Sequence, residues 1–236
     1  MRPAAGIDET IELQKAHGGG PEFSRPLGSA IVACVCAGAF DRVRAISEEV
    51  MPLALATGDA GTVAQTSLFG GMVDTAEGHF AEARTRMNGA VKIYHDTGMP
   101  WESAALAAAM GPVILMGDWE TARIDSERAV DLLRDKTVTT YYPVLIERIA
   151  GIAALCGDRF DLAEEHFDAA LQQAEALPFV SEQGEIRRWR ALMLLRRNAP
   201  GDQGRARKFL QEAGSEYSRH GMPKHRGMTE KILENL

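Results

Sequence analysis

The chain has 236 residues, 45% of them hydrophobic and 25% charged, which is ordinary for a globular protein and allows one large domain or two small ones. Aromatic residues make up only 6%, which suits closely packed helices better than a β-sandwich. The net charge of −7 combines −12 over residues 1–180 with +5 over residues 181–236, so the acidic bulk argues against non-specific nucleic-acid binding while the basic end leaves an acidic partner open.

An internal repeat of about 40 residues organises the chain. Two nearly identical phrases, YHDTGMP at 94–100 and YSRHGMP at 217–223, lie three repeats apart. One series of helix-ending residues consists of Gly38, Gly78, Gly117, Gly157 and Asn198. Glycine or asparagine at such positions is typical of a left-handed helix cap. We therefore expect the glycine of each phrase to have a positive φ, and the proline of each phrase to lie in the first turn of the next helix.

The repeat predicts a chain of helix pairs. The predicted units are a partial repeat at 7–17, five repeats at 22–57, 60–97, 100–135, 138–177 and 180–220, and a capping helix at 222–236. The first helices of the five pairs are expected at 22–37, 60–77, 100–116, 138–156 and 180–197. We therefore predict an all-α fold in a single domain, with each pair burying its apolar side against its neighbours.

The second helix of each pair carries a stripe of apolar or small residues at spacings of 3, 4, 3 and 4, which places them on one helix face. The clearest stripes are Phe80, Ala83, Met87, Ala90, Tyr94 and Phe160, Ala163, Phe167, Ala170, Ala174. We expect the aromatic residue at the head of a stripe to fill the gap at the turn. On the first helices, small residues precede the terminal Gly or Asn by about seven positions, at Gly71, Gly111, Gly151 and Ala191.

The two ends of the chain differ. Residues 7–17 match the second helix of a repeat, so we expect the chain to begin inside a repeat, as a piece of a longer protein or a shortened reading frame; a capping or frayed helix is the alternative. The N-terminus has no apolar segment typical of a secretory signal, and no uncharged run is long enough to cross a membrane. Three Cys make no disulfide framework, so we expect a cytoplasmic protein.

The recurring motifs resemble tetratricopeptide repeats. The resemblance is carried by G-D-W-x-x-A-x-x-x-x-x-x-A at 117–129, by G-H-F-x-x-A-x-x-x-x-x-x-A at 78–90, and by the small residues on the first helices. The period is longer than the standard 34, the standard late proline is missing, and the linkers at 138–143 and 198–204 are irregular. Units ending in Y-x-x-x-G-M-P look like the C-terminal tails of bacterial ATPase-linked transcriptional activators and nucleotide cyclases. The resemblance implies a right-handed α-α superhelix that serves as a sensor or docking scaffold in signalling.

Candidate catalytic chemistry is sparse. The chain has no P-loop, no nucleophile elbow and no zinc-binding spacing. Cys34 and Cys36 are two positions apart and would point away from each other on a helix, so buried apolar cysteines are the favoured interpretation. We expect the six His to have structural roles. We therefore predict no catalytic residue, no cofactor and no metal, although a helical enzyme with carboxylates converging in the inner groove is a further alternative.

The cluster RRWRALMLLRR at 187–197 is the strongest candidate site. In such stacks the first helices line the concave surface, and Arg188 and Arg196 are expected to point there, where arginine suits carboxylate or phosphate capture. The favoured alternative is pairing with Glu182, Glu185 and the acidic fourth repeat. The other expected concave positions are Leu68, Met72, Ala107, Ile114, Val144 and Glu147. From these sets we select Met72, Glu147, Arg188 and Arg196 as partner-binding residues.

Two functions from the same class lead. The first is a non-catalytic scaffold that binds a protein or peptide in a mostly apolar groove, with neither nucleic acid nor membrane as a direct partner. The second is the ligand-sensing regulatory tail of a larger transcriptional activator or nucleotide cyclase. The incomplete first repeat also offers a route to homo-oligomers.

Overall fold

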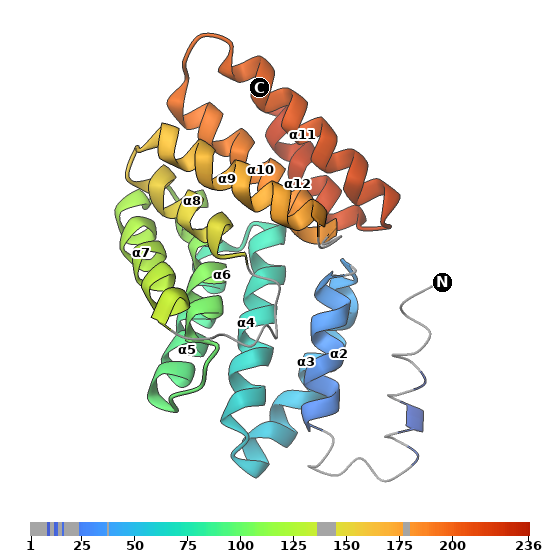
Figure 1. Ribbon diagram of the computed structural model, residues 1–236. Helices are drawn as coiled ribbons and strands as arrows, with labels where there is room; N and C mark the ends of the chain where they lie inside the picture. Colours follow the sequence, from blue (N-terminus) through green and yellow to red (C-terminus); the bar gives the residue numbers. More distant parts are fainter. Residues whose placement is uncertain are drawn as a thin grey trace. The chain divides into compact units, whose positions relative to one another are not determined.

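The computed structural model describes residues 24–36, 38–135, 145–176 and 180–236, with isolated positions at 9, 12, 13 and 16. Within these ranges it has eleven helices and no strand, so the all-α prediction is confirmed (Figure 1). The helices are α2 (Ser24–Cys36), α3 (Phe40–Thr57), α4 (Ala60–Glu77), α5 (Phe80–Asp96), α6 (Glu102–Leu115), α7 (Trp119–Asp135), α8 (Ile146–Cys156), α9 (Phe160–Ala176), α10 (Val180–Arg197), α11 (Asp202–Arg219) and α12 (Pro223–Glu234). The predicted partial repeat at 7–17 lies almost entirely outside the described residues.

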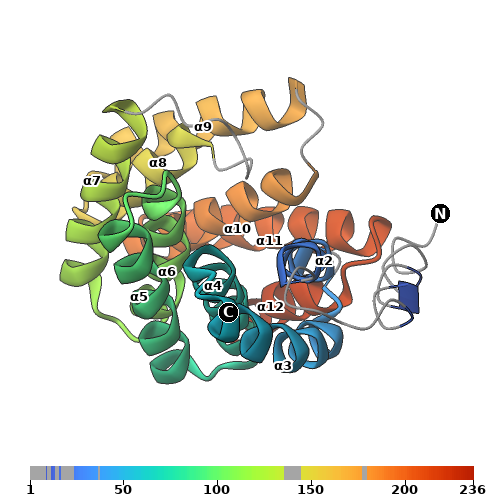
Figure 2. The ribbon, with the colours of Figure 1, turned by 90° about the horizontal axis from the view of Figure 1, so that it is seen from below.

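The helices form two compact units, Met1–Pro112 and Val113–Leu236. In the first unit α3 packs against α2 and α4, α4 packs against α5, and α2 also contacts α4. In the second unit each helix from α7 to α12 packs against the next one, and α8 also contacts α10. Figure 2 shows α10 and α11 side by side from a second direction. Within each unit, the two helices of a pair contact each other, and the first helix of one pair also contacts the first helix of the next pair, as α2 contacts α4 and α8 contacts α10.

The predicted stripes on the second helices are buried. Ala83, Met87, Ala90 and Tyr94 of α5 are at most 3% exposed, and the α9 stripe from Ala163 to Ala174 is fully buried. The stripe heads are less buried than the rest of the stripe: Phe40 is buried, Phe80, Trp119 and Phe160 are half-buried, and Gln203, which is not aromatic, is exposed.

Two of the small residues on the first helices are required by close packing. A Cβ atom on Gly71 would lie 2.5 Å from Met87 Cγ, and a Cβ atom on Gly151 would lie 2.7 Å from the Phe167 ring. Both glycines therefore face the third stripe residue of their own pair, where that residue is large. Gly111 is not constrained in this way, since the nearest atom to its Cβ position is 3.9 Å away.

The hairpin turns follow the predicted glycine series, with one exception. Gly38, Gly78, Gly117 and Asn198 have positive φ values between 51° and 93°. Gly157 does not, with φ −91°, and the left-handed residue of that turn is Asp158, with φ 56°. The Gly157 amide still donates to the Ala153 carbonyl, so the helical hydrogen bonding continues one residue further. Aspartate tolerates the left-handed region better than most residues, so moving the positive φ from Gly157 to Asp158 costs little free energy.

The two repeated phrases form the same turn but start the next helix differently. Gly98 and Gly221 have φ values of 64° and 68°, as predicted. Pro223 is the first residue of α12, which confirms that part of the prediction. Pro100 lies in the turn, two residues before α6 begins at Glu102, so the prediction is wrong for this proline.

Equivalent positions in the two units carry ion pairs of opposite polarity. Arg44 of α3 pairs with Glu77 of α4, with 2.8 Å between Nη1 and Oε1. Three repeats later, Glu164 of α9 pairs with Arg197 of α10, with 3.2 Å between Oε2 and Nη1. Each pair joins the second helix of one hairpin to the first helix of the next. The same contact is therefore made with the positive and negative charges exchanged.

Candidate functional site

The arginine-rich helix α10 supplies most of the charged side chains of the second unit. Arg188 is only 9% exposed along its side chain and forms a two-pronged ion pair with Glu185, at 2.6 Å and 3.2 Å. The Tyr217 hydroxyl of α11 donates to the same carboxylate at 2.9 Å. On the neighbouring first helix, Arg148 of α8 donates to both carboxylate oxygens of Glu182 at 2.8 Å and 2.9 Å. Two arginines and two carboxylates thus form a neutral, largely buried network.

The pKa of Glu185 reflects this network. Burial alone would raise it, but the positive charges of Arg188 and Arg148 and the hydrogen bond from Arg188 lower it to about 2. Burial and the adjacent Glu185 carboxylate raise the pKa of Tyr217 well above its usual value. Glu185 is therefore ionised and Tyr217 protonated at neutral pH, so the tyrosine is the donor in their hydrogen bond.

Arg196 joins three segments of the second unit. Its Nε donates to Asp158 Oδ1 at 2.7 Å, and its guanidinium lies 3.8 Å from the centroid of the Trp119 ring. This contact between a cation and an aromatic face is favourable, and it links α10 to α7 and to the turn between α8 and α9. The Arg196 side chain remains 24% exposed.

The remaining arginines of α10 also have acidic partners within the second unit. The ion pairs are Arg187 with Glu175, Glu212 and Glu216, Arg190 with Asp168, and Arg197 with Glu164 and Asp202. These contacts agree with the favoured alternative for Glu185 and the acidic fourth repeat, whereas Glu182 pairs with Arg148 of α8 and not with the cluster. A partner-binding role for Arg188 and Arg196 stays a prediction.

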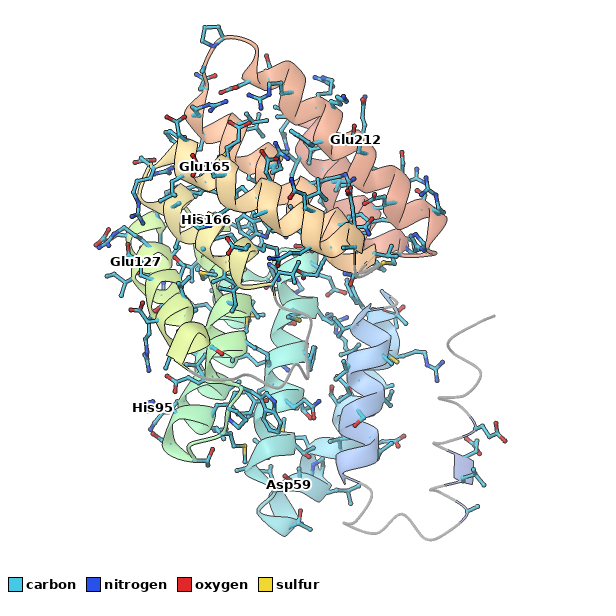
Figure 3. The ribbon with its side chains drawn as sticks, in the orientation of Figure 1. Asp59, His95, Glu127, Glu165, His166 and Glu212 are labelled. Carbon is cyan, nitrogen blue, oxygen red and sulfur yellow. The ribbon has the colours of Figure 1, made fainter. Side chains whose placement is uncertain are left out.

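The other predicted site residues lie in different surroundings. Glu147 Oε2 is 2.6 Å from Nδ1 of His166, which Figure 3 labels on α9, and its side chain is 33% exposed. Met72 belongs to α4 of the first unit and is half-buried. The apolar positions expected to line the groove are less accessible than predicted, because Leu68, Ala107 and Ile114 are buried. Val144 lies outside the described residues.

A shallow cavity of about 280 Å³ lies between α10 and α11, and it was not predicted from the sequence. Its lining consists of Arg187, Lys208, Gln211, Glu212, Ser215, Glu216 and Arg219. Burial raises the pKa of Glu216, although Arg187 and Arg219 act in the opposite direction. The α11 residues of the lining recur at helical spacing, and this polar stripe was the available signal. Figure 3 labels Glu212 on this helix.

The thiols of the described residues are buried. Burial raises the pKa of Cys156 to about 12, so it is protonated at neutral pH. Cys34 is also buried, which confirms this part of the prediction, while the Cys36 side chain lies outside the described residues. In the described part of the chain, no three His, Cys, Asp or Glu side chains come together in a way that could hold a metal ion. None of the helices described is both long and apolar enough to cross a membrane.

No protein-family model matches the chain. A search of curated proteins also finds no significant match. The resemblance to tetratricopeptide repeats thus rests on the residues alone.

Proposed function

We propose that the chain is a non-catalytic helical-repeat scaffold that binds a protein or peptide, with its helix pairs stacked as a right-handed superhelix similar to tetratricopeptide repeats. The observation that carries this proposal is the contact between first helices of consecutive pairs, α2 with α4 and α8 with α10. In stacked hairpin repeats such contacts place equivalent first-helix positions side by side, and an extended binding surface results. We place this scaffold in the bacterial cytoplasm, in signalling or regulation.

The predicted partner-binding residues differ in how readily they would reach a ligand. Glu147 and Arg196 keep 33% and 24% of their side-chain surface exposed. Arg188 would have to leave Glu185, and that would uncover a buried carboxylate at considerable cost. In the second unit we therefore assign recognition first to Glu147 and Arg196, with Arg188 as a support for that surface. In the first unit we assign Met72 as a separate apolar contact.

A peptide-array screen of the purified chain, followed by affinity measurements on the peptides that bind, tests the scaffold proposal. Glu147→Ala and Arg196→Ala should each weaken binding several-fold, whereas Arg207→Ala on the exposed face of α11 should leave it unchanged. Equal affinities for all three variants, or turnover of a small molecule by the purified chain, would contradict the proposal.

The second candidate is the ligand-sensing regulatory tail of a larger activator or cyclase. The support for it is the phrase Y-x-x-x-G-M-P, whose two copies adopt the same turn at Gly98 and Gly221. Sequencing the genomic region upstream of the Met1 codon tests this candidate. An in-frame ATPase would support it, and a promoter with a ribosome-binding site directly before Met1 would count against it.

A further inference from the structure

Two outer helices of the second unit expose charges of opposite sign. The exposed ionisable residues of α9 are all acidic, and α9 contains no Lys or Arg; they are Asp161, Glu165, Asp168 and Glu175. The exposed ionisable residues of α11 are all basic, namely Arg205, Arg207, Lys208 and Arg219. Both helices pack against α10, and Arg205 of α11 pairs with Glu164 of α9, so the two helices are neighbours on one side of the unit.

The acidic residues of α9 form a continuous ridge. They are separated by four, three and seven positions, which aligns them along one side of the helix. Asp161 and Glu165 are exposed and form no ion pair within the described part of the chain; Figure 3 labels Glu165 on α9. Asp168 and Glu175 are paired with arginines of α10, yet 53% of each side chain remains exposed.

The corresponding side of α11 is hollow and basic. The 280 Å³ cavity lies along this helix, and six of its seven lining residues, Ser215 among them, belong to α11. Lys208, 76% exposed along its side chain, and Arg219 are among its lining residues. Arg219 has no ion pair among the described residues. Glu216 is 15% exposed along its side chain and pairs with Arg187. Glu212 is 41% exposed and pairs with Arg187 and, at 3.9 Å, with Lys208. Three basic and two acidic side chains line the hollow, so its net charge is +1.

We propose that this face binds a second copy of the chain about a two-fold axis, with the acidic ridge of α9 in each copy set against the basic hollow of α11 in the other. A two-fold interface repeats every contact, so a face that carries both charges is complementary to itself. A nucleic acid or an anionic lipid surface would instead be repelled by the ridge. Leu162, 37% exposed on α9, adds an apolar contact beside the ridge.

The dimensions of the face predict a weak dimer. Two helices of this length offer a face of roughly 26 Å by 20 Å, or about 500 Å² for each copy. The total of about 1,000 Å² lies at the low end for specific protein pairs. Since exposed charges supply most of the attraction, salt should dissociate the dimer. This interface differs from the predicted route to oligomers through the incomplete first repeat, and it does not depend on the scaffold function.

Sedimentation equilibrium of the full chain, whose monomer has a mass of 25.6 kDa, is the direct test. The wild type should approach twice this mass at about 0.02 M salt and return to the monomer mass at about 1 M salt. The double variant Lys208→Glu/Arg219→Glu and the double variant Asp161→Lys/Glu165→Lys should each remain monomeric at low salt. Circular dichroism checks that both variants stay folded.

Mixing the two charge-reversed variants distinguishes this pairing from general charge effects. In the mixed pair, the unchanged acidic ridge meets an unchanged basic hollow, and the reversed hollow meets the reversed ridge, so dimers should reappear. Lys224→Glu/Lys231→Glu on α12 makes the same net-charge change as the α11 variant away from the cavity, and it should dimerise like the wild type.

A wild type that stays monomeric at both salt concentrations would overturn the proposal, as would a mixture of the two variants that does not associate. A wild-type monomer that binds a labelled hexaglutamate peptide, with weaker binding by Lys208→Glu/Arg219→Glu, would show that the hollow binds a separate acidic partner in place of a second copy of the chain.

Discussion

The two copies of the repeated phrase share a backbone but differ in what their tyrosines do. In both, the methionine amide donates to the tyrosine carbonyl, at 3.0 Å from Met99 to Tyr94 and at 2.8 Å from Met222 to Tyr217. Tyr94 then packs edge-on against Trp101, with 5.8 Å between ring centroids. Tyr217 instead bonds to Glu185 in the buried ion network. The repeat thus specifies the turn, while the residues of each pair decide how the tyrosine stabilises it.

The largest expected difference between the two phrases comes from Glu185. Its pKa falls from the usual 4.5 to about 2 in the folded chain, so it stabilises the fold above pH 4.5, and this stabilisation is lost as the pH falls towards 2. The shift corresponds to roughly 3 kcal/mol as an upper bound. Urea unfolding should show that the free energy of unfolding decreases as the pH falls through this range. In Glu185→Gln this decrease should be smaller. An unchanged pH profile in this variant would contradict the prediction.

Close packing around Tyr217 gives the next largest effect. A Cβ atom on Gly184 would lie 2.6 Å from the Tyr217 ring, so Gly184→Ala should lower the free energy of unfolding by about 2 kcal/mol. Gly89→Ala in α5 is the matched control, because its Cβ would meet nothing within 4 Å, and helix propensity should stabilise it by about 0.5–1 kcal/mol. Denaturant unfolding measures the free energy of unfolding of both variants. Similar free energies would show that the Tyr217 ring moves aside without cost and would contradict the prediction.

Removing the two hydroxyl groups compares the tyrosines directly. Tyr217→Phe should lose about 1.5 kcal/mol, because a hydrogen bond to an ionised carboxylate disappears. Tyr94→Phe should change the free energy of unfolding by less than about 0.5 kcal/mol, since packing against Trp101 remains. The comparison fails if the two variants unfold at the same denaturant concentration.

The shared backbone predicts equal losses at the two glycines. Neither Gly98 nor Gly221 has an atom within 4 Å of an added Cβ, so an alanine at either position would meet only the unfavourable positive φ. Each substitution should cost about 1 kcal/mol. Thermal unfolding of both variants checks this, and a difference of more than about 1 kcal/mol would mean that the turns are not equivalent.

The sequence predicted the elements that repeat, because repeated positions share one physical requirement. The stripes Ala83 to Tyr94 and Ala163 to Ala174 were predictable from spacing alone, since only one helix face can be buried in a pair. The shift from Gly157 to Asp158 was not predictable from glycine spacing, because it depends on how far α8 extends into the turn.

The candidate site was predictable only in part. The arginines of α10 were visible in the sequence, and pairing with Glu182, Glu185 and the acidic fourth repeat was the favoured alternative, which holds except for Glu182. Which carboxylate an arginine selects depends on how far apart neighbouring hairpins lie. Arg148 of α8 and Glu182 of α10, for example, are 34 positions apart, and no local sequence signal links them. The helical spacing of the polar residues on α11 was visible in the sequence, but the cavity also needs Arg187 of α10, and the spacing within α11 does not indicate which residue of α10 faces it.

The exchanged polarity of the pairs Arg44–Glu77 and Glu164–Arg197 has a consequence for folding. Repeats of similar shape risk stacking in the wrong order, within one chain or between chains during refolding. If α3 docked on α10 in place of α4, Arg44 would face Arg197, and if α9 docked on α4, Glu164 would face Glu77. Like charges would oppose both errors, so two weak surface pairs help to keep the order of the helices along the chain.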